Sequence, residues 1–426
     1  MENETNSGGG AESVLVVGAG IVGVSTALRL QRRGVAVTIV DSRLPGDGTS
    51  YGNAGVLATG SILPVTMPGL LKKVPGMLTD PLGPLYLRWS YLPKMAGWLR
   101  QYLSHCTPEK VRHIATHLAP ITANSLEEHE LVSKGTDAAR RIQRMGYAFV
   151  FKDKSDYEKD TLSWSLRREN DIPWKVFEGD AVREVEPALS PDYRCMVLMD
   201  HQHGSIDGPG DYVKALAEAF VAGGGRIERA EVRRLLSTDG AITGVEDVDG
   251  RTRHASTVVV ACGAWSAALL RTIGIEIPLE SERGYHVELL GSSVRPNNAV
   301  MVADGKFVAT PMSDRLRLAG LVEFGGLDAP PSTKPIRTLL TRIQRVFPGI
   351  SYDDHVTWMG HRPAPTDSLP IIGDTNRCRG LYMAFGHHHV GLTGGPRTGR
   401  LVADLIVGDR SNLDLSPYSA DRFKGA

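Results

Sequence analysis

Three glycines near the start of the chain have the spacing that lets a phosphate group approach a protein backbone. Gly18, Gly20 and Gly23 form a GxGxxG motif directly after the short apolar run 13–17. In such a motif the first glycine permits a tight turn, the second allows a pyrophosphate close to the main chain, and the third allows the next helix to pack on the strand. The free N–H groups and the positive dipole end of that helix favour an anion. The spacing therefore predicts a dinucleotide site.

The elements around this motif must hold it in place. The pattern predicts a buried strand over 13–17, a helix over 22–33 that ends at Gly34, and a second strand over 35–40. Asp41 ends that strand 18 residues after Gly23, where an acid accepts hydrogen bonds from ribose hydroxyls. This unit predicts that the dinucleotide is contacted by Gly18, Gly20, Ile21, Val22, Gly23, Asp41 and Ser42. The motif alone does not separate FAD from NAD.

The rest of the chain favours FAD. After Asp41 the repeated strand–helix pattern of an NAD domain stops, and the small polar loop 49–55 follows. A second loop before a helix lies at 391–395, and we expect that helix over 396–407, with Pro396 in its first turn, where helix starts accept proline. Two anion-binding loops far apart in sequence predict one extended cofactor held at both ends. The pyrophosphate would lie at the first loop and the flavin pyrimidine ring at the second, where the helix N-terminus would raise the flavin potential.

Composition excludes other classes of protein. Lys and Arg together number 48, as do Asp and Glu, and this balance argues against a nucleic-acid partner. None of the four cysteines has CxxC spacing, so no zinc or dithiol motif is visible. The run 387–389 is all histidine, but neighbours on an extended strand point to opposite faces and no third ligand is evident, so we predict no metal.

The sequence shows no recognisable targeting signal, which predicts a cytoplasmic location. Residues 1–12 are polar and Gly-rich, which predicts a disordered tail rather than a signal peptide, and no run of 18 apolar residues exists. The segment 82–103 mixes leucines and aromatics with basic residues. It leaves two interpretations open: peripheral contact with the inner face of a membrane, or an internal helical hairpin packed on the cofactor domain, which we favour.

Six segments in one order resemble the D-amino-acid oxidase superfamily of FAD enzymes, and within it the bacterial D-amino-acid dehydrogenases. They are VLVVGAGIVGVSTALRL, TSYGNAG, VVVACGAWS, RGYH, WMGHRPAPTDSLPIIG and GHHHVGLTGGPRTGRLVADL. The resemblance implies an α/β fold (α+β overall). A glutathione-reductase-like FAD-binding Rossmann domain would comprise 13–84, 200–277 and 356–420. A substrate domain with a mainly antiparallel mixed sheet and a helical insert would comprise 85–199 and 278–355.

The resemblance also implies roles for individual residues. Those expected to contact FAD, beyond the first loop, are Ser50, Asn53, Ala54, Gly55, Val232, Ala261, Gly263, Trp265, Gly391, Leu392 and Thr393. Arg362 matches the arginine that binds the substrate carboxylate, as a guanidinium fork suits that group. Tyr285 matches a strand that closes the substrate site, and His387 and His389 match its wall. The family often has glycine where His388 stands. Gly360, His361 and Arg362 occupy the neighbourhood where members with covalent flavin carry a cysteine, so noncovalent FAD is expected.

The implied reaction is the oxidative deamination of a small amino acid, most readily a D-amino acid. Hydride would pass from Cα to flavin N5, and the imine would hydrolyse to a 2-oxo acid. A quinone or other electron acceptor, or oxygen, would then take the electrons. The alternatives left open are oxidation of a proline-like or N-methyl amino acid (hydroxyproline, glycine or sarcosine), an NAD-linked dehydrogenase, and a flavin-binding subunit without turnover.

Overall fold

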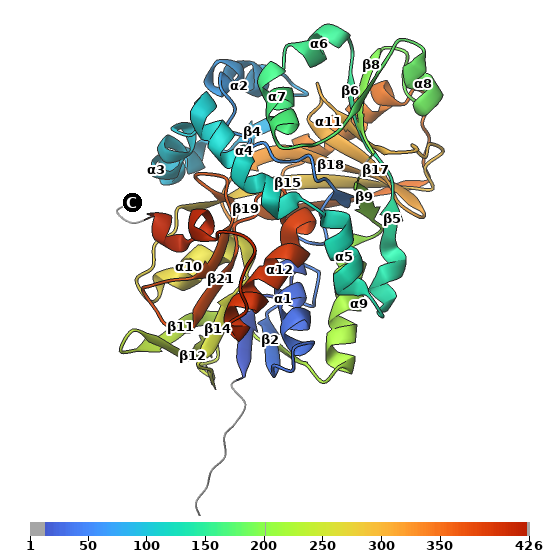
Figure 1. Cartoon of the computed structure of the whole chain (residues 1–426). Coiled ribbons are helices and arrows are strands. Elements are labelled where there is room, and N and C mark those ends of the chain that lie inside the picture. The colour runs from blue at the N-terminus through green and yellow to red at the C-terminus, as the bar shows by residue number, and fades with distance from the viewer. Residues whose placement is uncertain (1–12, 201, 424–426) are drawn as a thin grey trace, which may run out of the picture.

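A six-stranded sheet carries the GxGxxG motif (Figure 1). The computed structural model describes residues 13–200 and 202–423, so the tail predicted over 1–12 lies outside the described residues. In sheet order the strands are β10 (Arg226–Arg229), β2 (Val37–Asp41), β1 (Val14–Val17), β14 (Thr257–Val260), β21 (Leu381–Phe385) and β20 (Ile371–Asp374). All neighbours are parallel except β20 and β21. Parallel strands buried on both faces explain the continuous apolar runs.

Two helices pack closely on this sheet and on each other. They are α1 (Ile21–Gln31), which follows the motif, and α12 (Gly391–Val407). A Cβ on Gly399 would lie 2.7 Å from the backbone nitrogen of Thr26, and one on Gly395 would lie 3.1 Å from the Ile21 side chain. The glycines therefore allow contact along two helices that run in the same direction, and both N-termini lie at one end. The helix α12 begins at Gly391 rather than at 396, so Pro396 lies inside it.

A larger mixed sheet lies over the first one (Figure 1). Its strands in order are β19 (Asp354–Pro365), β15 (Leu279–Leu290), β18 (Arg315–Phe324), β17 (Phe307–Pro311), β16 (Ala299–Val302), β6 (Tyr147–Phe151), β8 (Cys195–Met199) and β7 (Lys175–Glu178), with β4 (Leu85–Leu87) beside β18. Helix α11 (Lys334–Val346) packs in the apolar cluster on one face. The strand β19 pairs with β15 along its whole length, so the domain boundary predicted at 356 falls inside a strand of this sheet.

Two small sheets, nine further α-helices and several 3-10 turns complete the described part of the chain. The small sheets join β3 (Val56–Leu57), β9 (Gly204–Ile206) and β5 (Ile142–Arg144), and β11 (Val232–Thr238), β12 (Ala241–Asp247) and β13 (Thr252–His254). The other α-helices are α2 (Leu70–Thr79), α3 (Leu92–Leu103), α4 (Pro108–Thr122), α5 (Ser125–Ser133), α6 (Lys154–Glu158), α7 (Thr161–Glu169), α8 (Ala181–Val185), α9 (Pro209–Ala222) and α10 (Ser266–Arg271). Short 3-10 turns are η1 (Trp89–Tyr91), η2 (Asp137–Arg141), η3 (Gly263–Trp265), η4 (Ser416–Tyr418) and η5 (Ala420–Phe423).

The segment 82–103 is not the helical hairpin that we expected. It forms the short strand β4 and the single helix α3, whose Trp98 Nε1 donates to the Ala364 carbonyl of β19 at 3.0 Å. Across the described residues, no helix is both long enough and apolar enough to cross a bilayer.

Candidate functional site

A cavity of about 1640 Å³ is lined by residues of both sheets. Pockets for drug-sized ligands span roughly 300–1,000 Å³, so this one has room for a larger ligand or for two. Most predicted site residues line it: Gly18, Gly20, Ile21, Val22, Asp41, Ser42, Ser50, Asn53, Ala54, Val232, Ala261, Gly263, Trp265, Gly391, Leu392, Thr393, Arg362, Tyr285, His387 and His389. Gly23 and Gly55 are not among the lining residues. They act on the backbone behind the cavity.

The turn at the first loop has the geometry of a phosphate cradle. Gly18 has φ +117°, and a Cβ there would lie 2.4 Å from the Ala261 carbonyl oxygen. A Cβ on Gly23 would lie 1.9 Å from the Gly18 carbonyl oxygen, so any larger residue would separate α1 from β1. The first-turn N–H groups of a helix have no acceptor within the helix, so those that no other protein group engages remain available to a ligand. This loop fits the pyrophosphate of a dinucleotide.

Two polar side chains order that turn. The Ile21 amide donates to Ser50 Oγ at 3.0 Å, and the Ala19 amide donates to Asp41 Oδ2 at 2.7 Å. Asp41 also accepts from the Arg43 amide through Oδ1 at 2.9 Å. The carboxylate therefore stabilises the loop itself, and its contact with a ribose stays a prediction.

The start of α12 depends on a histidine from α5. In a continuous helix the Leu392 carbonyl would accept from residue 396, but Pro396 has no N–H. His129 Nε2 lies 2.9 Å from that carbonyl oxygen, and His129 Nδ1 lies 2.9 Å from the Tyr212 hydroxyl. Because a carbonyl only accepts, Nε2 donates and Nδ1 accepts from Tyr212. Burial lowers the pKa of His129 to about 4, so this neutral tautomer persists at neutral pH.

The carbonyl of the next residue also has a partner on α5. Ser125 Oγ donates to the Thr393 carbonyl oxygen at 2.8 Å. The helix α5 thus holds the backbone of the turn where the resemblance expects the flavin pyrimidine ring.

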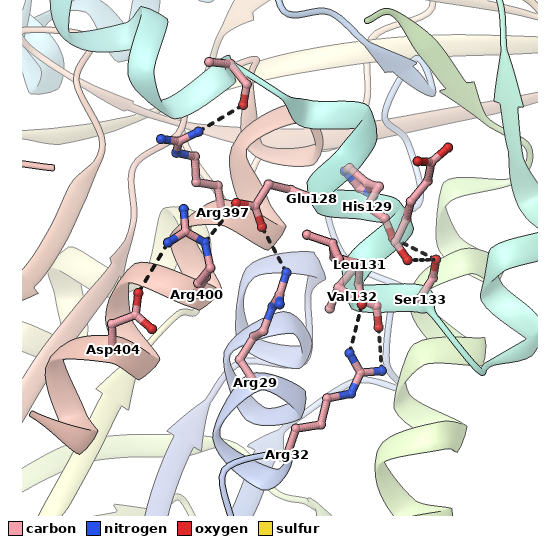
Figure 2. A network of polar contacts seen from close by, with 12 residues as sticks. Arg29, Arg32, Glu128, His129, Leu131, Val132, Ser133, Arg397, Arg400 and Asp404 are labelled. Atoms are coloured by element: carbon pink, nitrogen blue, oxygen red, sulfur yellow. Dashed lines mark hydrogen bonds and ion pairs between the residues drawn. The ribbon is translucent and has the colours of Figure 1, made fainter. Parts of the chain in front are cut away.

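Ion pairs join the same three helices (Figure 2). Glu128 of α5 accepts from Arg29 of α1 and from Arg400 of α12, both at 2.9 Å. The Arg400 guanidinium also lies 3.4 Å from Asp404 one turn further along α12. The Glu128 side chain is buried, which makes these pairs firmer in position than pairs in open solvent. The helices that present their N-termini to the cavity are therefore fixed relative to each other.

Arg362 lies in the opposite wall of the cavity. Its Nη1 donates to Glu282 Oε1 at 2.9 Å and to the Leu321 carbonyl at 3.0 Å, and Nη2 lies 3.3 Å from the Gly320 carbonyl oxygen. Glu282 faces Arg362 directly across the β15–β19 ladder. A Cβ on Gly284 would lie 2.4 Å from the guanidinium carbon, so this glycine makes room for the side chain.

The Glu282 carboxylate contacts both Arg362 and His388. Its other oxygen, Oε2, lies 2.6 Å from His388 Nε2. Burial on its own would raise the pKa of the Glu282 carboxyl, but His388 and Arg362 outweigh it and lower the pKa to about 2. The carboxylate therefore stays ionised and orients Arg362.

The three histidines do not form the extended strand that we assumed. His388 has φ +51°, which turns the chain between its neighbours. His387 Nε2 lies 2.8 Å from Thr398 Oγ1, and His389 Nδ1 is buried with no protein partner. Burial lowers the pKa of His387 to about 4 and that of His389 to about 3, so both are neutral. No cluster of three or more His, Cys, Asp or Glu suited to a metal occurs in the part of the chain that the structure describes.

The Tyr285 hydroxyl is already engaged. It donates to Glu323 and accepts from the Ser332 amide at 2.9 Å, while the ring packs in the cluster beneath α11. A role for Tyr285 toward substrate stays a prediction that these partners do not favour.

Two contacts of the predicted residues were not foreseen from the sequence. Glu282 and His129 were not predicted, although each contacts a predicted residue. Glu282 could be found from the register of β15 and β19, and Pro396 signals a helix carbonyl that needs another donor. The identity of that donor, 263 residues away, has no local signal.

A nucleotide-binding loop, a second helix end and an overlying sheet with a half-buried arginine together define a flavin-dependent oxidoreductase. The chain belongs to the DAO family, described as FAD dependent oxidoreductase, whose model matches residues 13–405. This membership confirms the predicted fold class and FAD as the cofactor.

Relatives of known name cover nearly the whole chain. A D-amino-acid oxidase from Bradyrhizobium diazoefficiens is 38% identical over 417 residues, which are 96% of this chain and 98% of that protein. A D-amino acid dehydrogenase from Rhizobium rhizogenes is 29% identical over 431 residues, 96% of this chain and 99% of that one. Glycine oxidase from Geobacillus kaustophilus has a similar fold, with a TM-score of 0.73 and 24% identity over 97% of this chain and all of its own.

Proposed function

We propose that the protein oxidises the Cα–N bond of a small amino acid, most readily a D-amino acid, to an imine that water hydrolyses to a 2-oxo acid. The observation that carries this proposal is Arg362, a guanidinium in the wall of the cavity that also contains both cofactor loops. The relatives named as D-amino-acid oxidase and D-amino acid dehydrogenase support it. When bound, FAD supplies the acceptor for the hydride that leaves Cα.

The side chains would bind and orient the substrate. Arg362 would take the α-carboxylate with the N–H groups that Glu282 and the two carbonyls leave open, while Glu282 holds the guanidinium in place. His389 Nδ1, buried and without a protein partner, is available to accept a hydrogen bond from the amine. Because His387 and His389 are neutral, neither adds a positive charge that would repel the substrate amine. A neutral amine transfers hydride readily, and positioning would supply most of the rate.

In this proposal the six-stranded sheet and its helices bind noncovalent FAD, and the larger sheet binds substrate. Both a quinone or other electron-transfer partner and oxygen remain acceptors to test, as do a cytoplasmic location and peripheral contact with a membrane. Proline-like and N-methyl amino acids, such as hydroxyproline, glycine and sarcosine, form the second substrate class. A glycine oxidase and an L-proline dehydrogenase from P. horikoshii, with TM-scores of 0.73, share the fold.

The decisive experiment is an anaerobic absorbance spectrum of the purified holoenzyme. Each D-amino acid, hydroxyproline, L-proline, glycine and sarcosine is added in turn. Bleaching of the flavin bands by a D-amino acid supports the proposal, and bleaching only by an imino or N-methyl compound favours the second substrate class. Flavin bands that no compound bleaches would show a flavin-binding protein without amino-acid turnover.

A further inference from the structure

A buried arginine, Arg167, lines the cavity without a carboxylate partner among the described residues. Three arginines of the described chain are buried: Arg167, Arg283 and Arg317. Arg283 pairs with Glu323 at 3.3 Å, and Arg317 pairs with Glu288. Arg167 forms no ion pair with any described residue, although it is 5% exposed and lines the cavity. A buried charge is normally paired, so the exception points to a partner from outside the chain.

The protein holds the Arg167 guanidinium in one position. Its Nε donates to the Gly60 carbonyl at 3.1 Å and its Nη1 to the Ser163 carbonyl at 3.2 Å. The guanidinium carbon lies 4.5 Å from the ring centre of Trp164 and 5.2 Å from that of Phe149. These contacts use two of the five N–H donors that an arginine carries. The group is therefore oriented, with donors left for a ligand.

Arg167 keeps its charge in this setting. Burial lowers the pKa of its guanidinium to about 10, which leaves it protonated at neutral pH. Asp160 opposes the effect of burial without forming an ion pair, and its Oδ1 accepts from Ser163 Oγ at 2.5 Å. A carboxylate that entered this end of the cavity would meet a cation that no protein group neutralises by contact.

Contacts connect Arg167 to the start of α12. Thr393 Oγ1 lies 3.4 Å from both the Ala58 amide nitrogen and the Val56 carbonyl oxygen. Residues 56–58 therefore pass beside the N-terminal end of α12. Gly60, which binds Arg167, is two residues further along. Two residues span at most about 7 Å. Arg167 therefore borders the part of the cavity that adjoins the cofactor.

We propose that Arg167 binds a second carboxylate of the substrate, so that the preferred substrates are dicarboxylic amino acids such as D-glutamate or D-aspartate. The α-carboxylate would lie on Arg362 and the distal carboxylate on Arg167. This inference rests on the proposed function of the same site. In the competing account, Arg167 serves only to pack between Trp164 and Phe149.

Matched pairs of substrates separate the effect of the distal carboxylate charge from the effect of side-chain shape. D-glutamate and D-glutamine have nearly the same shape, as do D-aspartate and D-asparagine, but only the acids carry a second carboxylate. Anaerobic flavin reduction gives kcat/KM for each, and we expect the holoenzyme to favour the acid of at least one pair by about 10- to 150-fold, the range for a hydrogen bond to a charged group. An acid-to-amide ratio of one or below in both pairs would overturn the inference.

Variants of Arg167 show whether this residue causes the preference for the acid over the amide. Arg167→Gln should bring the acid-to-amide ratio close to one with little change for the amide, and Arg167→Lys should recover part of the preference. Arg168→Gln is the matched control, because Arg168 is the next residue of α7 but is exposed and does not line the cavity. A ratio that Arg167→Gln leaves unchanged would assign Arg167 to packing.

Binding without turnover separates this inference from the proposed function. Perturbation of the flavin spectrum by glutarate and by its monoamide gives two dissociation constants that need no oxidation. Tighter binding of glutarate, lost in Arg167→Gln or Arg167→Lys, supports the anion site even if no amino acid bleaches the flavin. Equal binding of the two compounds together with bleaching by neutral D-amino acids would leave the proposed function intact and refute the role of Arg167.

Discussion

The bond from His129 to α12 gives a prediction whose size can be worked out. In His129→Leu, the Leu392 carbonyl would lose its donor, while the Tyr212 hydroxyl would lose the Nδ1 acceptor and keep the main-chain carbonyl of residue 129 at 3.4 Å. His129 is fully buried, so water does not replace it. A buried polar group left without a partner costs about 1–3 kcal/mol. We therefore expect the unpaired Leu392 carbonyl to lower the free energy of unfolding of the FAD-loaded protein by about 1–3 kcal/mol in chemical denaturation.

The redox potential and the affinity of FAD should also change in His129→Leu. If the first turn of α12 moves away, the reduced flavin loses the favourable field of a helix N-terminus. That field is worth about 0.3–1 kcal/mol and reaches about 2 kcal/mol in partly buried sites. For a two-electron couple this corresponds to a fall of about 5–40 mV in midpoint potential. Dye-equilibrium titration measures the potential, and fluorescence titration of the apoprotein measures the FAD dissociation constant, which should rise.

Two further variants sharpen the test. His129→Gln places an amide N–H near the position of Nε2 and should restore most of the potential. Leu131→Ala changes the same helix at a side chain that is 44% exposed and should leave the potential unchanged. If His129→Leu lost stability but kept both the potential and the FAD dissociation constant of the parent protein, His129 would support the fold alone and the positioning argument would be wrong.

The remaining predictions concern the substrate wall and pH. Arg362→Lys should lower kcat/KM for amino acids by about 10- to 150-fold without changing FAD content, because it loses the planar fork; an unchanged kcat/KM would exclude the carboxylate role. Gly284→Ala should displace the Arg362 guanidinium, which would lie 2.4 Å from the new Cβ, and so weaken amino-acid binding in flavin titrations. His129 and His387 have pKa values lowered to about 4, so they bind protons more readily when unfolded. The stability they contribute is present above about pH 6.5 and is lost as the pH falls toward 4, by about 3 kcal/mol for each histidine, and denaturant midpoints measured across that range should show the loss.

Local patterns predicted the parts of the site that depend on neighbouring residues. Gly18 and Gly23 meet each other across one turn, so their spacing was enough to predict both the turn and the helix that follows. The start of α12 was placed five residues too late, because Pro396 was taken as a first-turn residue. A proline inside a helix is tolerated when another group binds the carbonyl it leaves free, and here that group is His129.

Contacts between strands that are distant in the sequence could not be predicted from the pattern of residue types. Arg362 was predicted by resemblance to the family, but its pairing with Glu282 depends on the register of β15 and β19. The domain boundary predicted at 356 does not take that register into account, because β19 continues to Pro365 in the larger sheet. Pairing between strands depends on long-range packing, which a single sequence does not display.

The charges around Arg362 and Arg167 explain why these two arginines of the cavity should differ in function. Glu282 is ionised and bound to Arg362, so the positive charge of that guanidinium has a counterion in direct contact. Arg362 can orient an α-carboxylate through directed hydrogen bonds while attracting it only weakly. Arg167 has no such counterion, so its field favours an additional negative group. Geometry at Arg362 would then select an amino acid, and charge at Arg167 would select among amino acids, which is why the acid-to-amide ratio should respond to one arginine and the overall rate to the other.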